Sequence, residues 1–142
     1  MEPARQRESP DKTAMVEASE GRRFPRSHRL RTGAEFRAVY GRKVRASDGH
    51  LTVCVCENRI GHPRIGLSVS RKVGTAVVRN RWKRLLREAF RLNAGRLPQG
   101  VDLVVIPRPG PPPFFRDVEA SLCNTARRAA RRLNSGAVGN SG

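Results

Sequence analysis

The stretch AVVRNRWKRLLREAFR (76–91) combines an apolar stripe with dense positive charge. The rest of the chain must bury this apolar stripe. At about 100° per residue, its apolar side chains fall on one side of a helix: Val78, Trp82, Leu85 and Ala89. The opposite side carries Asn80, Arg84, Arg87 and Arg91, with Lys83 beside them and Arg79 and Arg81 on the flanks. The pattern predicts a helix over about 75–93 with one face in a core and cations on the other.

Apart from Glu88, the charged residues of the stretch 76–91 are all basic, which favours an external anion. Solvated helix faces usually alternate signs and so gain i,i+4 ion pairs. Here Lys83 and Arg87, and again Arg87 and Arg91, stand at like-charge i,i+4 spacing, which costs a few tenths of a kcal/mol per pair. Guanidinium forks bind phosphate oxygens in pairs, so the face is predicted to bind phosphates. The alternative is a solvated basic surface.

The charge of the whole chain agrees with a polyanionic partner. The 142 residues carry a formal net charge of +17, well above the ~2–8 that keeps a small domain soluble. Basic and acidic side chains cancel within 1–23, so all of the excess lies in 24–142. We expect a disordered extension over 1–23, one folded domain over 24–133, and a flexible Gly/Ser/Asn-rich tail over 134–142.

Three segments around the basic helix have strand character. LTVCVCE (51–57) and RIGLSVS (64–70) place alternate residues on opposite faces, as half-buried strands do, and a turn falls between them. The two segments are predicted to pair as an antiparallel hairpin. DLVVI (102–106) is continuously apolar, which is typical of a central strand covered on both faces. A short extra strand is expected around 42–46.

Two further helices complete the predicted fold. Thr32 and Glu35 form a capping-box pattern, so a helix should begin there and end near Gly41. A stiff proline-rich connector then precedes a last helix over about 114–133, with acidic residues early and arginines late. The order is α-β-β-(β)-α-β-α, which predicts an α+β fold with helices packed on a small mixed sheet.

An aromatic pair on the first predicted helix suggests a second site. Phe36 and Tyr40 stand at i,i+4 and share a face, with several arginines and a lysine around them. Aromatic rings among cations suit single-stranded nucleic acid, whose bases stack while the cations follow the backbone. The alternative is that both rings pack in the core, and the residues alone leave both possibilities open.

Catalytic and metal-binding chemistry is sparse. The three histidines have no evident nucleophile partner, and Cys54 and Cys56 with the nearby histidines match no standard zinc spacing. Three cysteines without a disulfide framework favour a reducing compartment. No apolar run is long enough for a membrane span and the N-terminus lacks a signal-peptide pattern, so we expect a cytoplasmic protein.

The stretch RIGLSVSRKVGTAVVRNRWKRLLREAFR (64–91) resembles the signature of the bacterial ribonuclease P protein component. It has the strand, the Lys/Arg-rich turn, the Gly-x-Ala-Val step and the Arg-Asn-Arg helix of that family, and the resemblance extends over about 30–133. It implies the protein subunit of a ribonucleoprotein endonuclease, a hydrolase that removes 5′ leaders from precursor tRNA. Catalysis would come from the RNA subunit with bound Mg²⁺. The family fold has a left-handed crossover around the basic helix, against the usual right-handed rule.

The resemblance also implies two RNA-binding sites and no catalytic or metal-ligating residue in the protein itself. The basic helix would bind the catalytic RNA through Arg79, Asn80, Arg81, Lys83, Arg84, Arg87 and Arg91. A cleft between the first helix and the sheet would take the single-stranded leader of precursor tRNA through Phe36, Tyr40, Cys54, Ser68 and Lys72. No obligate protein partner is expected.

The chain departs from the family at two of its positions. Cys54 stands where the family often has an aromatic residue, so stacking there would be weaker. Trp82 is bulkier than the usual aliphatic residue and is expected to be buried against the sheet. Two other functions are compatible with the residues: a general RNA-binding or ribosome-associated protein without a role in cleavage, and a stand-alone nuclease, against which the lack of an acid/base or metal cluster argues.

Overall fold

The computed structural model describes residues 26–139, so the extension predicted over 1–23 lies outside the described residues. Within this range the element order is the predicted α-β-β-(β)-α-β-α, and the optional strand is present. The elements are η3 (Arg26–His28), α1 (Gly33–Arg42), β1 (Val44–Ser47), β2 (Leu51–Glu57), β3 (Arg64–Leu67), η4 (Arg71–Val73), α2 (Ala76–Asn93), β4 (Val101–Pro107) and α3 (Phe115–Gly139).

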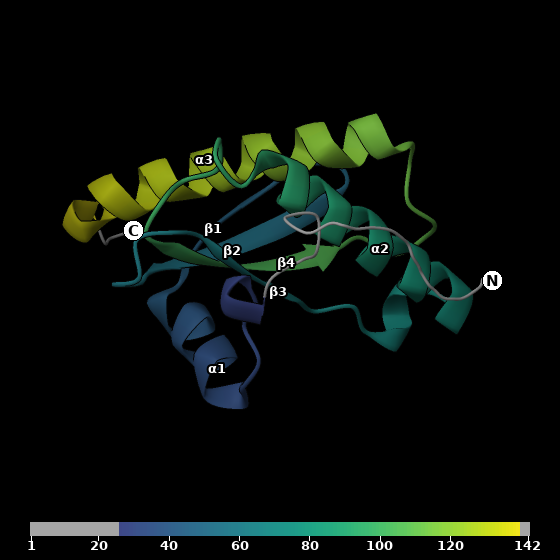
Figure 1. Ribbon diagram of the computed structural model, residues 1–142, viewed down its shortest axis with the longest axis horizontal. Helices are drawn as coiled ribbons and strands as arrows, with labels where there is room; N and C mark the ends of the chain where they lie inside the picture. Colours follow the sequence, from purple (N-terminus) through teal and green to yellow (C-terminus); the bar gives the residue numbers. More distant parts are fainter. Residues whose placement is uncertain (1–25, 140–142) are drawn as a thin grey trace.

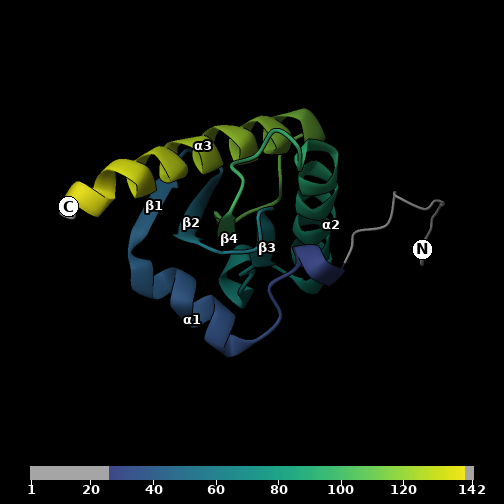
Figure 2. The same ribbon diagram turned by 60° about the vertical axis from the view of Figure 1, so that its left-hand side comes forward.

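The four strands form one sheet that is covered by helices on both faces. Figures 1 and 2 show α2 and α3 against one face and α1 against the other. The larger apolar cluster lies on the side of α2 and α3 and includes Trp82, Leu103 and Leu122. A smaller cluster lies under α1 and includes Val39 and Val104. This is the predicted α+β class, with separate cores on the two faces of the sheet.

The sheet has the order β1-β2-β4-β3, so the predicted hairpin of 51–57 with 64–70 is wrong. β2 pairs antiparallel with β1 on one side and with β4 on the other. β3 pairs parallel with β4, which therefore separates the two predicted partners. The reason is burial: β4 is apolar on both faces, and the order β1-β2-β3-β4 would leave this strand at an exposed edge.

The second face of β2 is also buried, which corrects the prediction of a half-buried strand. Leu51, Val53 and Val55 pack in the larger cluster, whereas Cys54 and Cys56 pack in the smaller one under α1. The alternation along this strand therefore separates two cores from each other and does not separate core from solvent. The burial of β4 on both faces confirms the prediction of a central strand.

The helix α2 connects the parallel neighbours β3 and β4, which gives the expected βαβ unit. Trp82 is buried in this unit, as predicted, and its indole Nε1 donates a hydrogen bond of 2.8 Å to the carbonyl oxygen of Gly110. A buried indole N–H needs such a partner. The bond ties α2 to the loop that leads into α3. The left-handed sense of the crossover stays a prediction.

Three predicted boundaries differ from the structure. α1 continues through Gly41, and the left-handed position that ends it is Lys43, with φ 61°. β3 ends at Leu67 because Ser70 caps η4 by accepting a hydrogen bond from the backbone N–H of Lys72. α3 continues to Gly139, so part of the segment predicted as a flexible tail is helical. No proline interrupts that segment.

Candidate nucleic-acid interface

The helix α2 forms where it was predicted, and both of its ends are anchored. Thr75 caps the first turn, since its Oγ1 accepts a hydrogen bond from the backbone N–H of Val78 at 3.3 Å. At the other end the buried Asn93 donates from Nδ2 to the carboxylate of Glu119 in α3, at 2.8 Å. The helix is therefore fixed rigidly enough to present side chains in a defined array.

The two predicted faces of α2 are present, with the buried face turned slightly from the expected one. Trp82 and Ala89 are buried as predicted, but Val78 and Leu85 are only partly buried. The remaining apolar burial comes from Leu86 and Phe90. On the outward side, the exposed residues are Asn80, Arg81, Arg84 and Arg87, and the half-buried ones are Arg79, Lys83 and Arg91.

Two of the predicted RNA-binding arginines have partners within the protein. Arg79 donates from Nε to the carbonyl oxygen of Gly74 at 3.2 Å, across the start of the helix. Arg91 forms a two-point ion pair with Glu88, with N–O distances of 2.6 and 3.1 Å. Both arginines therefore have less capacity for an external phosphate than their neighbours on the outward face.

Arg87 lies in a strongly positive environment. Although part of the Arg87 side chain is exposed, the protein atoms around its guanidinium desolvate the group and lower its pKa, and the nearby charge of Arg29 lowers the pKa further. An arginine stays protonated at neutral pH even so. A phosphate beside Arg87 would reduce the repulsion between these two like charges.

The aromatic pair on α1 is divided between core and surface. Phe36 is half-buried and packs on the smaller cluster with Leu30 and Val39. Tyr40, one turn later, is 41% exposed. The structure therefore gives Phe36 a packing role with partial exposure, while Tyr40 is exposed to solvent. Packing in the core therefore applies to Phe36, and binding of nucleic acid by the exposed Tyr40 stays a prediction.

Cys54 does not face solvent, although it was expected to line the leader cleft. The residue is 4% exposed and stands opposite Arg45 in the β1–β2 register. Burial raises the pKa of the Cys54 thiol, while the charge of Arg45 and a hydrogen bond from it act in the opposite direction. The exposed group at this point is therefore the Arg45 guanidinium. Sequence reasoning counted this arginine among the basic residues around the aromatic pair but gave it no individual role.

Ser68 and Lys72, the other expected leader contacts, lie just beyond β3. Ser68 is half-buried, and its backbone N–H donates to the carbonyl oxygen of Val105 at 2.9 Å. Lys72 is exposed in η4, the short turn that leads directly into α2. Lys72 therefore lies between β3 and α2, the helix that carries the outward cations.

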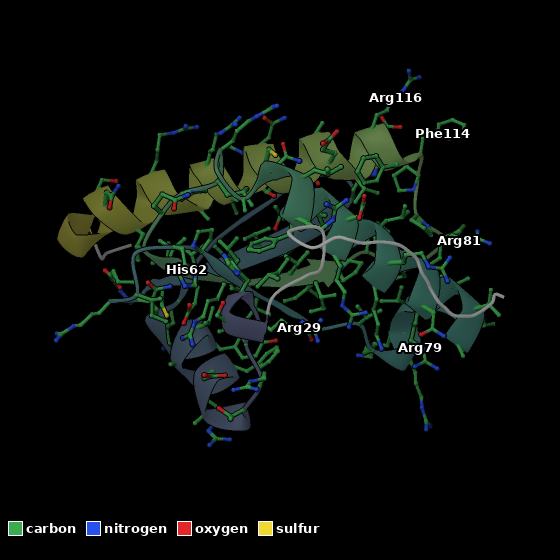
Figure 3. All side chains as sticks on the ribbon, in the orientation of Figure 1. Arg29, His62, Arg79, Arg81, Phe114 and Arg116 are labelled. Atoms are coloured by element: carbon green, nitrogen blue, oxygen red, sulfur yellow. The ribbon has the colours of Figure 1, made fainter. Side chains whose placement is uncertain are left out.

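An exposed aromatic ring that sequence reasoning missed lies at the same end of the molecule as the start of α2. Phe114, the residue directly before α3, is 75% exposed. Figure 3 shows Phe114 and Arg116 at the end of the molecule that also carries Arg79 and Arg81. Nothing in the local sequence pattern marked this ring, because its exposure depends on how the connector 108–113 is held against α2.

Within residues 26–139, no group of three or more His, Cys, Asp and Glu side chains could hold a metal ion. The sheet separates Cys54 and Cys56 from Cys123, which lies in the other cluster. The rings of His28 and His62 pack with centroids 4.4 Å apart, and burial, followed by the charge of His62, lowers the pKa of His28. None of the described helices combines the length and apolarity needed to cross a membrane.

Comparison with known proteins points to one family. A family model described as Ribonuclease P matches residues 24–132. The chain is 41% identical over 106 residues to a ribonuclease P protein component of Clostridium botulinum, covering 73% of this chain and 96% of that protein. It is 50% identical over 90 residues to the ribonuclease P protein component of Methylococcus capsulatus, covering 63% of this chain and 70% of that protein.

Solved structures give the same result for the fold. The RNase P protein of Staphylococcus aureus superposes with a TM-score of 0.63 at 32% identity, covering 72% of this chain and 94% of that one. The RNase P protein of Thermotoga maritima gives a TM-score of 0.62 at 33% identity, covering 70% and 96%. The observed arrangement of three helices on a four-stranded mixed sheet is therefore that of a known group of proteins.

Proposed function

The chain belongs to the ribonuclease P protein family and acts in tRNA 5′ processing, and we propose that it does so by binding two RNAs on two surfaces. In this proposal the outward face of α2 holds the catalytic RNA. The surface formed by α1 and the adjoining face of the sheet holds the 5′ leader of precursor tRNA. The protein thereby assists the endonucleolytic removal of the leader.

The observation that carries the proposal is the sorting of α2 into a core face and an outward cationic face. Arg84 and Arg87 are exposed, one turn apart, on a helix whose other side is fixed in the larger cluster. A rigid row of guanidinium groups suits the regular phosphates of a folded RNA. The net charge of +17 supplies long-range attraction for the same partner.

The proposed leader site uses a different kind of contact. Tyr40 offers an exposed side chain, Phe36 a partly exposed ring, and Arg45 an exposed cation on strand β1. Single-stranded RNA is bound by such mixtures, since bases stack on rings while cations meet the backbone. Cys54 lies beneath this surface, so its contribution would be to support Arg45 and not to stack.

We place the chemistry of cleavage on the RNA subunit. Mg²⁺ would be held mainly by that RNA, where it can activate water and stabilise charge at the scissile phosphate. The described protein residues fit a role in binding and orienting the RNAs, since exposed arginines line the outward face of α2 and the aromatic residues Tyr40 and Phe114 are exposed. A cytoplasmic location agrees with the free, buried cysteines Cys54, Cys56 and Cys123.

Reconstitution tests the proposal directly. The protein is mixed with a bacterial ribonuclease P RNA and a 5′-extended precursor tRNA at low Mg²⁺ concentration, and leader release is followed over time. We expect faster release only when the catalytic RNA is present. Cleavage by the protein alone would identify a stand-alone nuclease, and binding without any change in rate would identify a general RNA-binding protein.

Variants locate the two surfaces. Arg84→Ala and Arg87→Ala, singly and together, should weaken binding of the catalytic RNA and reduce its salt dependence, by roughly 0.7–0.9 in log–log slope per lost phosphate contact. Arg59→Ala is the control, since Arg59 is exposed in the turn between β2 and β3. Tyr40→Ala should weaken binding of precursor tRNA more than of mature tRNA. Equal losses for the two tRNAs would remove Tyr40 from the leader site.

A further inference from the structure

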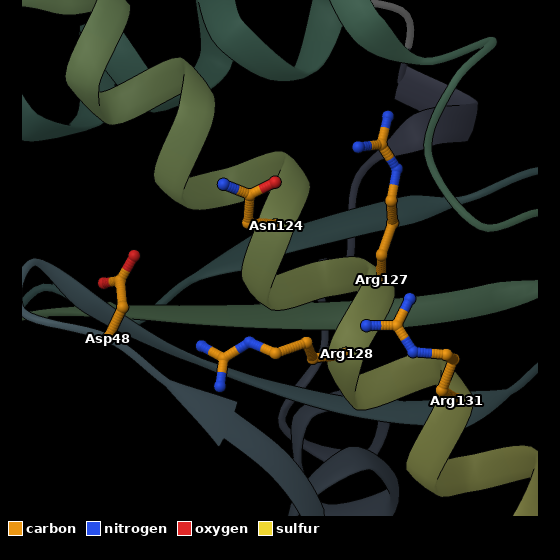
Figure 4. A pocket seen from close by; sticks show the side chains of 5 residues that line it. All are labelled: Asp48, Asn124, Arg127, Arg128 and Arg131. Carbon is orange, nitrogen blue, oxygen red and sulfur yellow. The ribbon is translucent and has the colours of Figure 1, made fainter.

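A second basic surface lies on α3, on the face of the sheet opposite α1. An open hollow of about 520 Å³ is lined by five residues: Asp48, Asn124, Arg127, Arg128 and Arg131. Figure 4 shows Arg127 and Arg131 leaving the same side of α3, while Arg128 points toward the turn between β1 and β2. We propose that Arg127 and Arg131, with Asn124, form a second binding site for RNA phosphates, separate from the outward face of α2.

The arginines of this part of α3 divide into two structural groups. Arg128 donates from Nη2 to the carbonyl oxygen of Ser47 at 2.6 Å, and Arg132 donates from Nη1 to the carbonyl oxygen of Arg45 at 2.5 Å. These two side chains hold β1 against α3. Among the described residues, no hydrogen bond or ion pair engages the guanidinium of Arg127 or Arg131, and both are exposed.

Within the described residues, the acidic residue at the rim of the hollow, Asp48, forms no ion pair with Arg127 or Arg131. Its Oδ1 accepts hydrogen bonds from the backbone N–H groups of His50 and Leu51, at 2.8 and 3.0 Å, so this oxygen is used within its own turn. Burial pushes the pKa of Asp48 upward, but hydrogen bonds from Ser121 and from these N–H groups hold it below its ordinary value.

The spacing of Arg127 and Arg131 favours a shared anion. Side chains at i,i+4 are neighbours on a helix, and two like charges there are destabilising unless an anion binds them. Two guanidinium groups side by side can each bind phosphate oxygens at two points. Asn124, one turn before Arg128 on the same helix, adds an amide that can donate to a phosphate or contact a 2′-hydroxyl.

The partner is identified as RNA through the chemistry of the site and through the proposed function, on which this inference rests. α3 packs against β1 and β2 from the side opposite α1, and Figure 2 shows α1 and α3 on opposite faces of the sheet. A nucleotide in contact with Tyr40 therefore cannot also reach Arg131. The RNA at α3 must be a different segment, so the protein would contact RNA on more than one side.

The test compares salt dependence in matched variants. Arg127→Ala with Arg131→Ala should lower RNA affinity roughly tenfold near physiological salt and reduce the log–log salt slope by about 1–2. Binding is measured for the catalytic RNA alone, for precursor tRNA alone and for their complex, which identifies the RNA that supplies the phosphates. Thermal unfolding of this double variant should match that of the wild-type protein.

Two controls make the outcome decisive. Arg128→Ala should lower the unfolding temperature, because it removes the contact to Ser47, while the salt slope changes little. Arg59→Ala removes an exposed charge elsewhere and should change neither quantity. An unchanged slope for the Arg127/Arg131 variant with all three RNA samples would overturn the inference. If the Arg84/Arg87 variant also left the slope unchanged, the proposed function would fail as well, so the two failures are distinguishable.

Discussion

The ring of Phe36 lies directly against the backbone of Gly66. A Cβ atom added at Gly66 would stand 2.6 Å from Cζ and 2.9 Å from Cε2 of that ring. Because Gly66 on β3 has no side chain, Phe36 of α1 can approach the sheet closely. This contact sets the distance between α1 and the sheet. The position of the proposed leader site depends on this contact.

Gly66→Ala should displace Phe36 without removing it. We expect a loss of stability of about 1–3 kcal/mol from overpacking and weaker binding of precursor tRNA relative to mature tRNA. Gly41→Ala is the matched control, since the added Cβ would meet no atom within 4 Å beyond its chain neighbours and the backbone of its own helix. Binding assays with the two tRNAs and urea unfolding measure both effects. If the ratio of affinities for precursor and mature tRNA stayed unchanged while stability fell, Phe36 would have no role in leader binding.

The ion pair between Arg64 and Asp102 should contribute more to stability than the exposed pairs. Its N–O distances are 2.7 and 2.8 Å, and the Asp102 side chain is only 7% exposed. Asp102→Asn removes the two-point charged partner of Arg64, which keeps only the longer contact with Glu35 at 3.3 Å, and this should cost about 3 kcal/mol in the free energy of unfolding. Glu57→Gln breaks the more exposed pair with Arg42 and should cost less than about 1 kcal/mol. Similar losses in the free energy of unfolding for both variants, measured in urea, would contradict the larger contribution of the Arg64–Asp102 pair.

The capping box of α1 predicts a dependence of stability on pH. Hydrogen bonds from the backbone N–H groups of Arg31 and Thr32 lower the pKa of Glu35 below 4.5, and the charge of Arg64 adds to this. A lowered carboxyl pKa stabilises the fold above about pH 4.5, and this contribution is lost as pH falls through the folded-state value. Relative to Glu35→Gln, the wild type should gain about 0.5–1 kcal/mol at pH 7. In urea unfolding, the free energies of unfolding of the two proteins should become equal in acid. A difference that persists at pH 2 would show that the ionised Glu35 carboxylate is not its source.

Local patterns in the sequence were sufficient to predict most elements. The helix over 75–93, its cationic side and the capping box at Thr32 all depend on spacing within a few residues, and the structure confirms them. The pairing of 51–57 with 64–70 was wrong because strand partners are chosen by the burial of β4, far along the chain. The covering of Cys54 by α1 likewise depends on tertiary packing.

The candidate sites show the same division between local and tertiary information. The ion pair of Glu88 with Arg91 follows i,i+3 spacing and could have been foreseen from the sequence. The bond from Arg79 to Gly74 depends on how η4 leads into α2. The separation of Arg127 and Arg131 from Arg128 depends on where β1 lies against α3. No spacing rule along the chain could have predicted these contacts.

The Cys56 thiol should be unreactive in the folded protein at ordinary pH. Burial, with the negative charges of Asp102 and Glu57 adding to it, raises the pKa of Cys56 to about 11. The thiolate is the reactive form, and only about 0.1% of the Cys56 thiol is ionised at pH 8, so its reaction would be slow even if reagent could reach it. Alkylation with iodoacetamide, followed by peptide mass spectrometry, should label Cys56 in urea but not in buffer. Rapid labelling of the native protein at pH 8 would contradict this.

The exposed ring of Phe114 should add to the binding of RNA by stacking and not by charge. It is 75% exposed and lies at the end of the molecule that carries Arg79 and Arg81 (Figure 3). Phe114→Ala should weaken binding of the catalytic RNA by roughly fivefold to a hundredfold, as loss of one base–aromatic stack does, with the salt slope unchanged. Phe114→Leu keeps an apolar side chain without a ring and should lose most of the same affinity. Ile60→Ala, which removes another exposed apolar side chain, is the control and should bind as the wild type does. Full affinity in Phe114→Leu would show that apolar contact is sufficient and that no base stacks on the ring.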